Sequence, residues 1–241
     1  MIALLLNSGL GSRMGDETQE HPKCLCRLND AETIFSWQVK LLERIGVTEA
    51  VVTTGHLAEM LEEYVNQLGA DIRFHFVHNP RYRETNYIYS MYLARDLLED
   101  DVLLLHGDLV LHPRVMEQLA SAAVSSVAVD ASLPLPEKDF KAQLVDGRVK
   151  GIGIDRFGED CVACQPAYKW LKQDFQRWMG EITRFIASGE ERCYAENAFN
   201  AAWREMPLYP LDVQGLLCNE IDNQEDRKLV SERFRREVMG Q

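Results

Sequence analysis

The sequence predicts an α/β fold built on a mostly parallel β-sheet. Two uninterrupted apolar runs, Ile2–Leu6 and Val102–Leu105, have the length and composition of strands that are buried on both faces. Between these runs, segments with helical spacing alternate with short strand-like segments. Such alternation is typical of parallel strands joined by right-handed crossovers, and it is the main reason for the prediction.

The first half of the chain contains the clearest alternation. Apolar residues recur with helical spacing from Glu32 to Ile45, and Gly46 is suited to end that helix. A strand, a second amphipathic helix and an alternating strand follow. A further helix begins near Asn86 and precedes the apolar run at Val102. The expected ranges are a strand over 47–54, a helix over 57–68 and a strand over 72–76.

The second half differs in pattern. Val127 and Val129 indicate a strand that leads into a proline-rich loop, and Asp146-Gly147 is typical of a hairpin turn. We expect a helix over 174–189 and another that begins near Cys193, followed by a strand over 208–211 and a charged terminal helix. A smaller, mixed part of the sheet is therefore expected in this half.

Composition excludes some classes of protein. The 241 residues carry 38 acidic and 26 basic side chains, a formal net charge of −12. This balance argues against a nucleic-acid-binding protein, which needs a basic face. No apolar run approaches the ~20 residues that span a membrane, and the first residues lack the pattern of a secretory signal. Six cysteines without a second zinc-ligand pair favour reduced, mostly buried thiols, so we expect a cytoplasmic protein.

The first twenty-three residues contain the strongest functional signal. The strand Ile2–Leu6 runs into a turn in which Gly9 and Gly11 leave backbone N–H groups accessible to a polyphosphate. Arg13 is suited to bidentate phosphate binding, and Lys23 follows a proline that stiffens the backbone. The turn lacks the third glycine of a dinucleotide-binding loop and the Gly-Lys-Ser/Thr of a P-loop. It therefore predicts an anion site of another kind.

A strand, Gly-x-Gly-x-Arg, a short polar spacer and Pro-Lys together resemble the signature of the sugar-phosphate and alcohol-phosphate nucleotidyltransferases. The resemblance implies a Rossmann-like three-layer α/β/α nucleotidyltransferase fold, similar to GT-A, with a small mixed-sheet acceptor region. The usual signature has two alanines where this chain has Asn7 and Ser8. By this resemblance the nucleotide-binding residues of the loop are Asn7, Ser8, Gly9, Leu10, Gly11, Ser12, Arg13 and Lys23.

The segment from Asn79 to Ser90 resembles one in bacterial phosphocholine and 2-aminoethylphosphonate cytidylyltransferases. It contains Asn-Pro-x-Tyr followed by Asn-x-x-Tyr-Ser. The resemblance implies that Asn86 and Ser90 border the pyrimidine site of CTP. Spacing alone equally supports a capped helix with aromatic core residues.

Acidic residues at two places suggest a magnesium site. The apolar strand that ends in Gly107-Asp108 puts a carboxylate at the carboxyl edge of the sheet, where open α/β folds bind ligands. Glu220 and Asp222 resemble the second metal motif of the phosphocholine-type enzymes, and in a strand both side chains would face the same side. The expected Mg²⁺ ligands are Asp108, Asp222 and Glu220, with Gly107 at the nucleotide and His106 expected to pack or cap.

Three residues of the second half are acceptor candidates. Lys141 lies where the resembling enzymes place a basic residue toward the acceptor phosphate. Tyr194 and Glu196 are suited to hold a cationic head group through a ring face and a carboxylate. Each also has an ordinary explanation, as an exposed loop lysine or as packing and surface residues.

Together, these features predict a Mg²⁺-dependent cytidylyltransferase. The resemblance implies that Lys23, Arg13 and Lys141 are catalytic. It also implies one domain over 1–241, in which residues 1–126 bind the nucleotide and 127–241 bind the acceptor. An acceptor oxygen would attack the α-phosphorus of CTP and release pyrophosphate. The expected partners are CTP and a small phosphorylated acceptor such as phosphocholine, 2-aminoethylphosphonate or glutamine phosphate.

Two other functions remain open at this stage. A sugar-1-phosphate nucleotidyltransferase would use UTP or dTTP, and a catalytically silent subunit would bind nucleotide without turnover. The departures at Asn7 and Ser8 and in the proline-rich loop separate this chain from the main phosphocholine enzymes. The sequence also leaves open whether the chain forms a homodimer.

Overall fold

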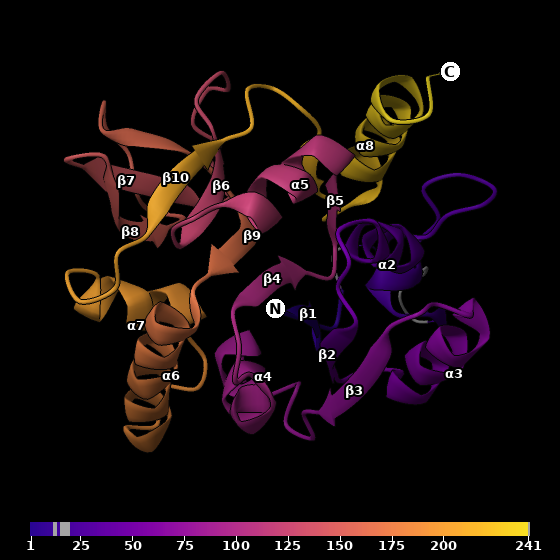
Figure 1. The fold of residues 1–241 in the computed structure, drawn as a ribbon, viewed down its shortest axis with the longest axis horizontal. Helices are drawn as coiled ribbons and strands as arrows, with labels where there is room; N and C mark the ends of the chain where they lie inside the picture. The colour runs from indigo at the N-terminus through magenta and orange to yellow at the C-terminus, as the bar shows by residue number, and fades with distance from the viewer. Residues whose placement is uncertain (12–13, 15–19, 241) are drawn as a thin grey trace.

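The computed structural model describes residues 1–11, 14 and 20–240. Nine strands of the described chain form one sheet in the order β10-β6-β9-β4-β1-β2-β3, with β7 paired to β9 and β8 to β7 (Figure 1). The strands are β1 (Ile2–Asn7), β2 (Glu49–Thr54), β3 (Arg73–His78), β4 (Val102–His106), β6 (Ser126–Asp130), β7 (Lys141–Val145), β8 (Arg148–Gly153), β9 (Cys161–Trp170) and β10 (Tyr209–Asp212).

The central part of the sheet is parallel, as predicted. β1 pairs with β4 on one side and with β2 on the other, and β2 pairs with β3, all in parallel. In this register Leu4 lies between Leu104 and Val51. The carboxyl ends of these strands therefore lie along one edge of the sheet.

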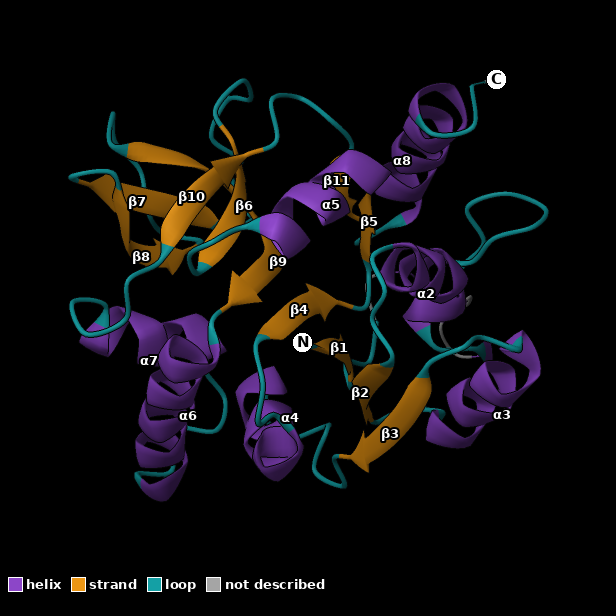
Figure 2. Cartoon of the chain, in the orientation of Figure 1, coloured by secondary structure: helices purple, strands orange, loops and turns teal. Residues whose placement is uncertain are grey.

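Helices cover both faces of the sheet and form a three-layer architecture, which confirms the predicted fold class (Figure 2). Leu4 and Leu6 of β1 pack in the core beneath one set of helices, whereas Ala3 and Leu5 pack in the core beneath the other. The alternation of side chains along a strand produces this division. The first set is α4 (Tyr87–Ala94), α6 (Lys172–Ala187) and α7 (Ala195–Ala202), and the second is α2 (Ile34–Arg44), α3 (Ala58–Leu68) and α5 (Pro113–Ser121).

Most predicted elements agree with the structure to within two residues. The helix expected over 32–45 is α2, and the strand expected over 72–76 is β3. The hairpin expected at Asp146-Gly147 joins β7 and β8, and both turn residues have positive φ, 49° and 73°. Two residues of positive φ are characteristic of a type I′ turn, whose twist matches that of the flanking strands.

Two elements of the described chain have no predicted counterpart, α5 and β9. β9 is a ten-residue strand that pairs antiparallel with both β4 and β6, so it joins the two parallel parts of the sheet. Pro166 interrupts its sequence, and a proline argues against a central strand. The structure accommodates it because the pairing with β6 shifts register between Val127 and Val129.

A small second sheet positions the C-terminal acidic residues. β5 (Leu109–Leu111) and β11 (Cys218–Glu220) pair antiparallel, with Glu220 opposite Leu109. The Ile221 N–H donates to the Asp108 carbonyl at 2.9 Å. The predicted strand thus ends at Gly107-Asp108 as expected, and Leu109–Leu111 form a separate strand that pairs with β11.

The terminal helix α8 (Gln224–Glu237) holds this arrangement against α2. Phe234 is fully buried and meets the Trp37 ring edge-on, with 4.9 Å between ring centroids. The Asn223 side chain caps α8 by accepting from the N–H groups of Glu225 and Asp226. The chain before α8 is thus fixed at the edge of the main sheet.

Two expectations about the whole chain can be compared with the structure. No helix among the described residues is long and apolar enough to cross a membrane. Five of the six cysteines are buried, and Cys193 is partly buried. The prediction of mostly buried thiols is confirmed.

Candidate active site

A cavity of about 380 Å³ opens at the carboxyl edge of β1 and β4. Its wall comes from the loop after β1, the short 3₁₀ helix η2 (Lys23–Leu25), the start of α4, the residues after β4, and β11 with the residues that follow it. The loop before β7 adds the opposite wall. This position is the usual ligand site of an open α/β sheet.

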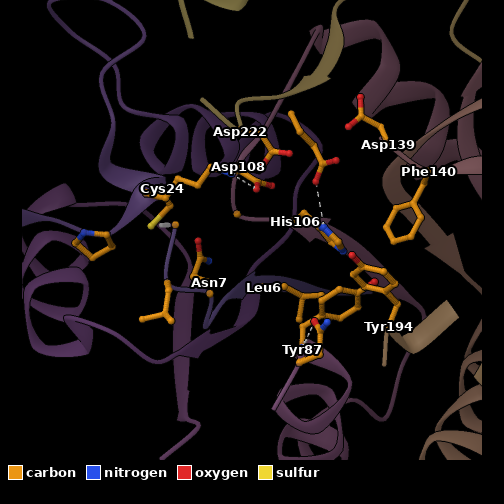
Figure 3. Close-up of a pocket in the computed structure, with 18 of the residues that line it drawn as sticks. Leu6, Asn7, Cys24, Tyr87, His106, Asp108, Asp139, Phe140, Tyr194 and Asp222 are labelled. Atoms are coloured by element: carbon orange, nitrogen blue, oxygen red, sulfur yellow. Dashed lines mark hydrogen bonds and ion pairs between the residues drawn. The ribbon is translucent and has the colours of Figure 1, made fainter. Parts of the chain in front are cut away.

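Lys23 lines this cavity between two acidic side chains, Asp108 and Asp222, which lie close together (Figure 3). Its ammonium donates to Asp108 Oδ2 at 2.6 Å and to Asp222 Oδ1 at 2.7 Å. Burial raises the pKa of Asp108. The charges of Lys23 and His106 and the hydrogen bonds of Lys23 and Glu220 together outweigh burial and hold that pKa below its usual value. Three residues that are far apart in sequence thus form one charged cluster.

His106 and Glu220 extend the cluster. Nδ1 of His106 lies 3.3 Å from Glu220 Oε1, and one ligand atom each from His106, Asp108 and Glu220 lie within 4.8 Å of one another. Burial and the neighbouring Asp108 charge raise the pKa of Glu220 to about 7. His106 also packs edge-on against the Tyr87 ring, as expected, with centroids 4.8 Å apart.

The predicted Mg²⁺ ligands therefore lie together. Asp108 Oδ1 is buried and has no hydrogen-bond partner within the described chain. A buried, unpaired carboxylate oxygen beside two further carboxylates is a donor set that fits a divalent cation with oxygen preference. Glu220 and Asp222 both line the cavity although β11 ends at Glu220. Their magnesium role remains a prediction.

Asn7, the last residue of β1, presents a side-chain amide to the cavity. Both polar side-chain atoms of Asn7 are buried without a hydrogen-bond partner among the described residues. Asn7 lies directly over Gly107, where a Cβ would be only 1.9 Å from Asn7 Oδ1. Position 107 therefore requires glycine so that Asn7 can occupy the cavity wall. Gly9, Leu10 and Gly11 line the same wall, while Ser12 and Arg13 lie outside the described residues.

Ser8 and Ser90 form a support behind this wall. Their hydroxyl oxygens are 2.7 Å apart, and Asn79 Nδ2 donates to Ser90 Oγ at 3.0 Å. Ser90 is fully buried and does not line the cavity. Asn86 caps α4 by accepting from the Tyr87 N–H at 2.7 Å, and it lines the cavity and an adjoining hollow of about 160 Å³.

A profile of the MobA-like NTP transferase domain matches residues 3–145, more than half of the chain. The chain belongs to this family. The matched residues include β1, the glycine-rich loop, Lys23 and Asp108, whereas Asp222 lies beyond them. The predicted assignment to the nucleotidyltransferases is confirmed.

Three known proteins show the relationship in more detail. A CMP-5′-(3-aminopropyl)phosphonate synthase of Streptomyces rubellomurinus is 41% identical, over 96% of this chain and 38% of its own length. A CTP:phosphoglutamine cytidylyltransferase of Campylobacter jejuni is 27% identical, over 55% of this chain and 53% of its own length. The structure of a CTP:phosphocholine cytidylyltransferase of Streptococcus pneumoniae has a TM-score of 0.80 at 20% identity, covering 96% of this chain and 98% of that chain.

The match to the Streptomyces synthase therefore covers nearly all of this chain but less than half of that protein. This chain spans about two fifths of the Streptomyces synthase and about half of the Campylobacter enzyme. The structural likeness to the Streptococcus enzyme establishes the shared fold.

The three acceptor candidates occupy different positions in this NTP transferase. Tyr194 lines the cavity, with Phe140 edge-on to it at 5.1 Å between centroids. Glu196 is buried and accepts from the Tyr168 hydroxyl at 2.8 Å and from the Tyr87 hydroxyl, so it supports Tyr87 from behind. Lys141 is also buried, and its ammonium donates to the Pro136 carbonyl at 2.6 Å. The structure does not bring Glu196 or Lys141 to the cavity wall.

Other residues take the positions that sequence reasoning gave to these two. Lys138, Asp139 and Phe140 line the cavity from the proline-rich loop, and Tyr87 lines it from α4. One feature of the sequence could have indicated the loop residues among them. The proline-rich loop directly precedes a strand, so its last residues must lie at the edge of the sheet. The sequence gave no means of deciding whether Lys138 or Lys141 faces the cavity.

We predict that Gly107→Ala weakens nucleotide binding. The added Cβ must displace Asn7 from the wall, and losing one polar contact of this kind corresponds to about 1.4 kcal/mol, or roughly tenfold in affinity. Titration calorimetry with CTP measures the change. Gly180→Ala in α6 is the control, because a Cβ there meets nothing within 4 Å. Unchanged affinity in the Gly107 variant would show that Asn7 does not contact the nucleotide.

The raised pKa of Glu220 predicts a stability that falls with rising pH. Its folded value of about 7 exceeds the ordinary 4.5, so the folded chain retains a proton that the unfolded chain releases in this interval. The free energy of unfolding should therefore fall as pH rises from about 4.5 to about 7, by at most roughly 3 kcal/mol. Urea unfolding of Glu220→Gln and the parent chain, both with chelator, tests this. Identical pH dependence in the two proteins would contradict it.

Proposed function

We propose that this chain is a Mg²⁺-dependent cytidylyltransferase that transfers CMP from CTP to a small amine-bearing phosphonate or phosphate. The observation that carries the proposal is the cluster of Lys23, Asp108 and Asp222, which lies beside a glycine-rich loop at the sheet edge. The relatives named above support CTP as the nucleotide and an aminoalkylphosphonate as the first acceptor to test.

The reaction needs positioning and charge neutralisation rather than a protein nucleophile. An acceptor oxygen forms a bond to the α-phosphorus of CTP, while the bond from that phosphorus to the bridging oxygen breaks and pyrophosphate leaves. Backbone N–H groups of the glycine-rich loop would receive the leaving phosphates. Asp108, Asp222 and Glu220 would hold Mg²⁺, which when bound neutralises charge on the triphosphate.

Lys23 has two roles in this proposal. In the structure its ammonium neutralises Asp108 and Asp222 and prevents their mutual repulsion. With substrates present, the same ammonium would move to the reacting phosphate. There it would stabilise the charge that grows on the α-phosphoryl oxygens. One ammonium cannot fully neutralise the two carboxylates and the reacting phosphate at the same time. Binding of a metal ion to the carboxylates is therefore coupled to release of Lys23 from them.

The cavity wall that contains Tyr87, Phe140 and Tyr194 is suited to an ammonium group. Phe140, Tyr194 and Tyr87 present aromatic rings there, with 5.9 Å between the centroids of the two tyrosines. Asp139 adds a carboxylate to the same wall. Aromatic faces and a carboxylate attract an alkylammonium more strongly than they attract the hydroxyl groups of a hexose. This favours an amine-bearing acceptor.

A substrate panel tests the proposed function. Pyrophosphate release with Mg²⁺ is measured for four nucleotides against 3-aminopropylphosphonate, 2-aminoethylphosphonate, phosphocholine, glutamine phosphate and glucose 1-phosphate. We expect turnover with CTP and an aminoalkylphosphonate. Turnover only with UTP or dTTP and glucose 1-phosphate would instead assign a sugar-phosphate nucleotidyltransferase. Nucleotide binding without turnover on any acceptor would contradict the proposal and favour a silent subunit.

A second prediction concerns Lys23 itself. Lys23→Met should lower turnover by about a hundredfold, because a charge-stabilising contact is worth roughly 3 kcal/mol. The same variant should bind Mn²⁺ about tenfold more tightly without nucleotide, because the ammonium no longer competes for the two carboxylates. Electron paramagnetic resonance of free Mn²⁺ gives the affinity. Lys40→Met is the control, since Lys40 pairs with Glu32. Weaker Mn²⁺ binding in the Lys23 variant would contradict the competition.

A further inference from the structure

Lys141 is a buried lysine that directly follows Phe140 in the chain. Phe140 belongs to the acceptor wall, the part of the cavity wall formed by Tyr87, Asp139, Phe140 and Tyr194. Lys141 is the first residue of β7, its side chain is fully buried, and its ammonium donates to the Pro136 carbonyl at 2.6 Å. The Glu137 carbonyl lies 3.5 Å from the same nitrogen. On another side the ammonium faces the ring of Phe157, 4.2 Å from its centroid.

These contacts connect two loops that are separate in sequence. Pro136 and Glu137 belong to the loop between β6 and β7, and Phe157 belongs to the loop between β8 and β9. Each loop also contributes to the cavity, the first through Phe140 and the second through Ile154. Lys141 thus contacts both of the loops through which Phe140 and Ile154 reach the cavity wall.

The energetics make this contact a strong one. A buried ammonium is costly unless its donors are satisfied, so the carbonyl of Pro136 and the ring of Phe157 must stay in place around it. A carbonyl acceptor fixes the path of the backbone itself rather than one side chain. Because Phe140 directly precedes Lys141 and packs on Tyr194, a shift in this backbone changes the wall.

We propose that Lys141 is a positioning residue that clasps the loops 131–140 and 154–160 together and so determines how tightly the acceptor is held. The proposal departs from a direct contact between Lys141 and the acceptor phosphate. Its kinetic consequence rests on the proposed cytidylyltransferase function, whereas its structural consequence does not. The two consequences are tested separately.

The structural test is amide hydrogen exchange of the ligand-free chain. Lys141→Met keeps the length and apolar stem of the side chain but removes its donors. We expect exchange in 131–140 and 154–160 to accelerate about tenfold, the loss of roughly one hydrogen bond, while β1 and β4 stay protected. Lys138→Met is the matched control, because this lysine of the same loop is exposed and lines the cavity. Unchanged exchange in the Lys141 variant overturns the clasp, whatever the activity.

The kinetic test separates a clasp from a direct phosphate contact. Phe157 is 60% exposed and does not line the cavity, so Phe157→Leu is expected to fold normally. A clasp predicts that Lys141→Met and Phe157→Leu each raise the KM for the acceptor, with kcat and the KM for CTP within about twofold of the parent. The clasp also predicts the acceptor KM of the double variant. Its fold increase should not exceed the product of the two single-variant increases, and it should be closer to the increase seen in Lys141→Met alone.

A direct contact predicts a different pattern. Lys141→Met would then lower kcat strongly, and Phe157→Leu would change nothing. That result overturns the clasp as the basis of acceptor binding. If the parent chain turns over no acceptor of the panel, the proposed function fails instead, and the exchange experiment alone decides whether Lys141 joins the two loops.

Discussion

The contact of the Lys23 ammonium with Asp108 and Asp222 is the interaction on which the rest of the site depends. Its three members come from the start, the middle and the end of the chain, and one oxygen of each carboxylate lies within 2.7 Å of the ammonium nitrogen. Two partly buried carboxylates this close would repel each other without a cation between them. The fold must therefore bring a positive charge to this point, either from its own lysine or from a bound metal ion.

The architecture explains how such distant residues meet. Parallel β1 and β4 bring the glycine-rich loop and Asp108 to the same edge, because the carboxyl ends of parallel neighbours coincide. Asp222 arrives by another route, through the pairing of β11 with β5 and the burial of Phe234 on α8. The C-terminal helix therefore has a functional consequence, since it holds the residues of the second carboxylate against the first.

Elements with a strong local pattern in the sequence could be predicted, and elements that depend on distant contacts could not. β1, α2 and the β7–β8 hairpin were predictable because periodicity and turn chemistry act within a few residues. β9 was not, because Pro166 conceals a strand whose partners lie far away in sequence. The cavity residues at the carboxyl edge of β1 and β4 could be found from motifs beside strand ends. The burial of Glu196 and Lys141 could not be predicted in the same way, because it depends on packing between distant segments and not on local residue spacing.

These differences have a common physical cause that bears on how acceptor choice is encoded. The part of the site proposed for the nucleotide is built on paired central strands, where a change in backbone would disturb the whole sheet. Part of the wall proposed for the acceptor, Asp139 and Phe140, is instead carried by the proline-rich loop, which one buried lysine joins to the loop after β8 through contacts with a carbonyl and a ring. Substitutions in the proline-rich loop can therefore reshape the acceptor wall while Lys23, Asp108 and Asp222 stay in place. The fold thus separates a fixed reaction centre from an adjustable recognition surface.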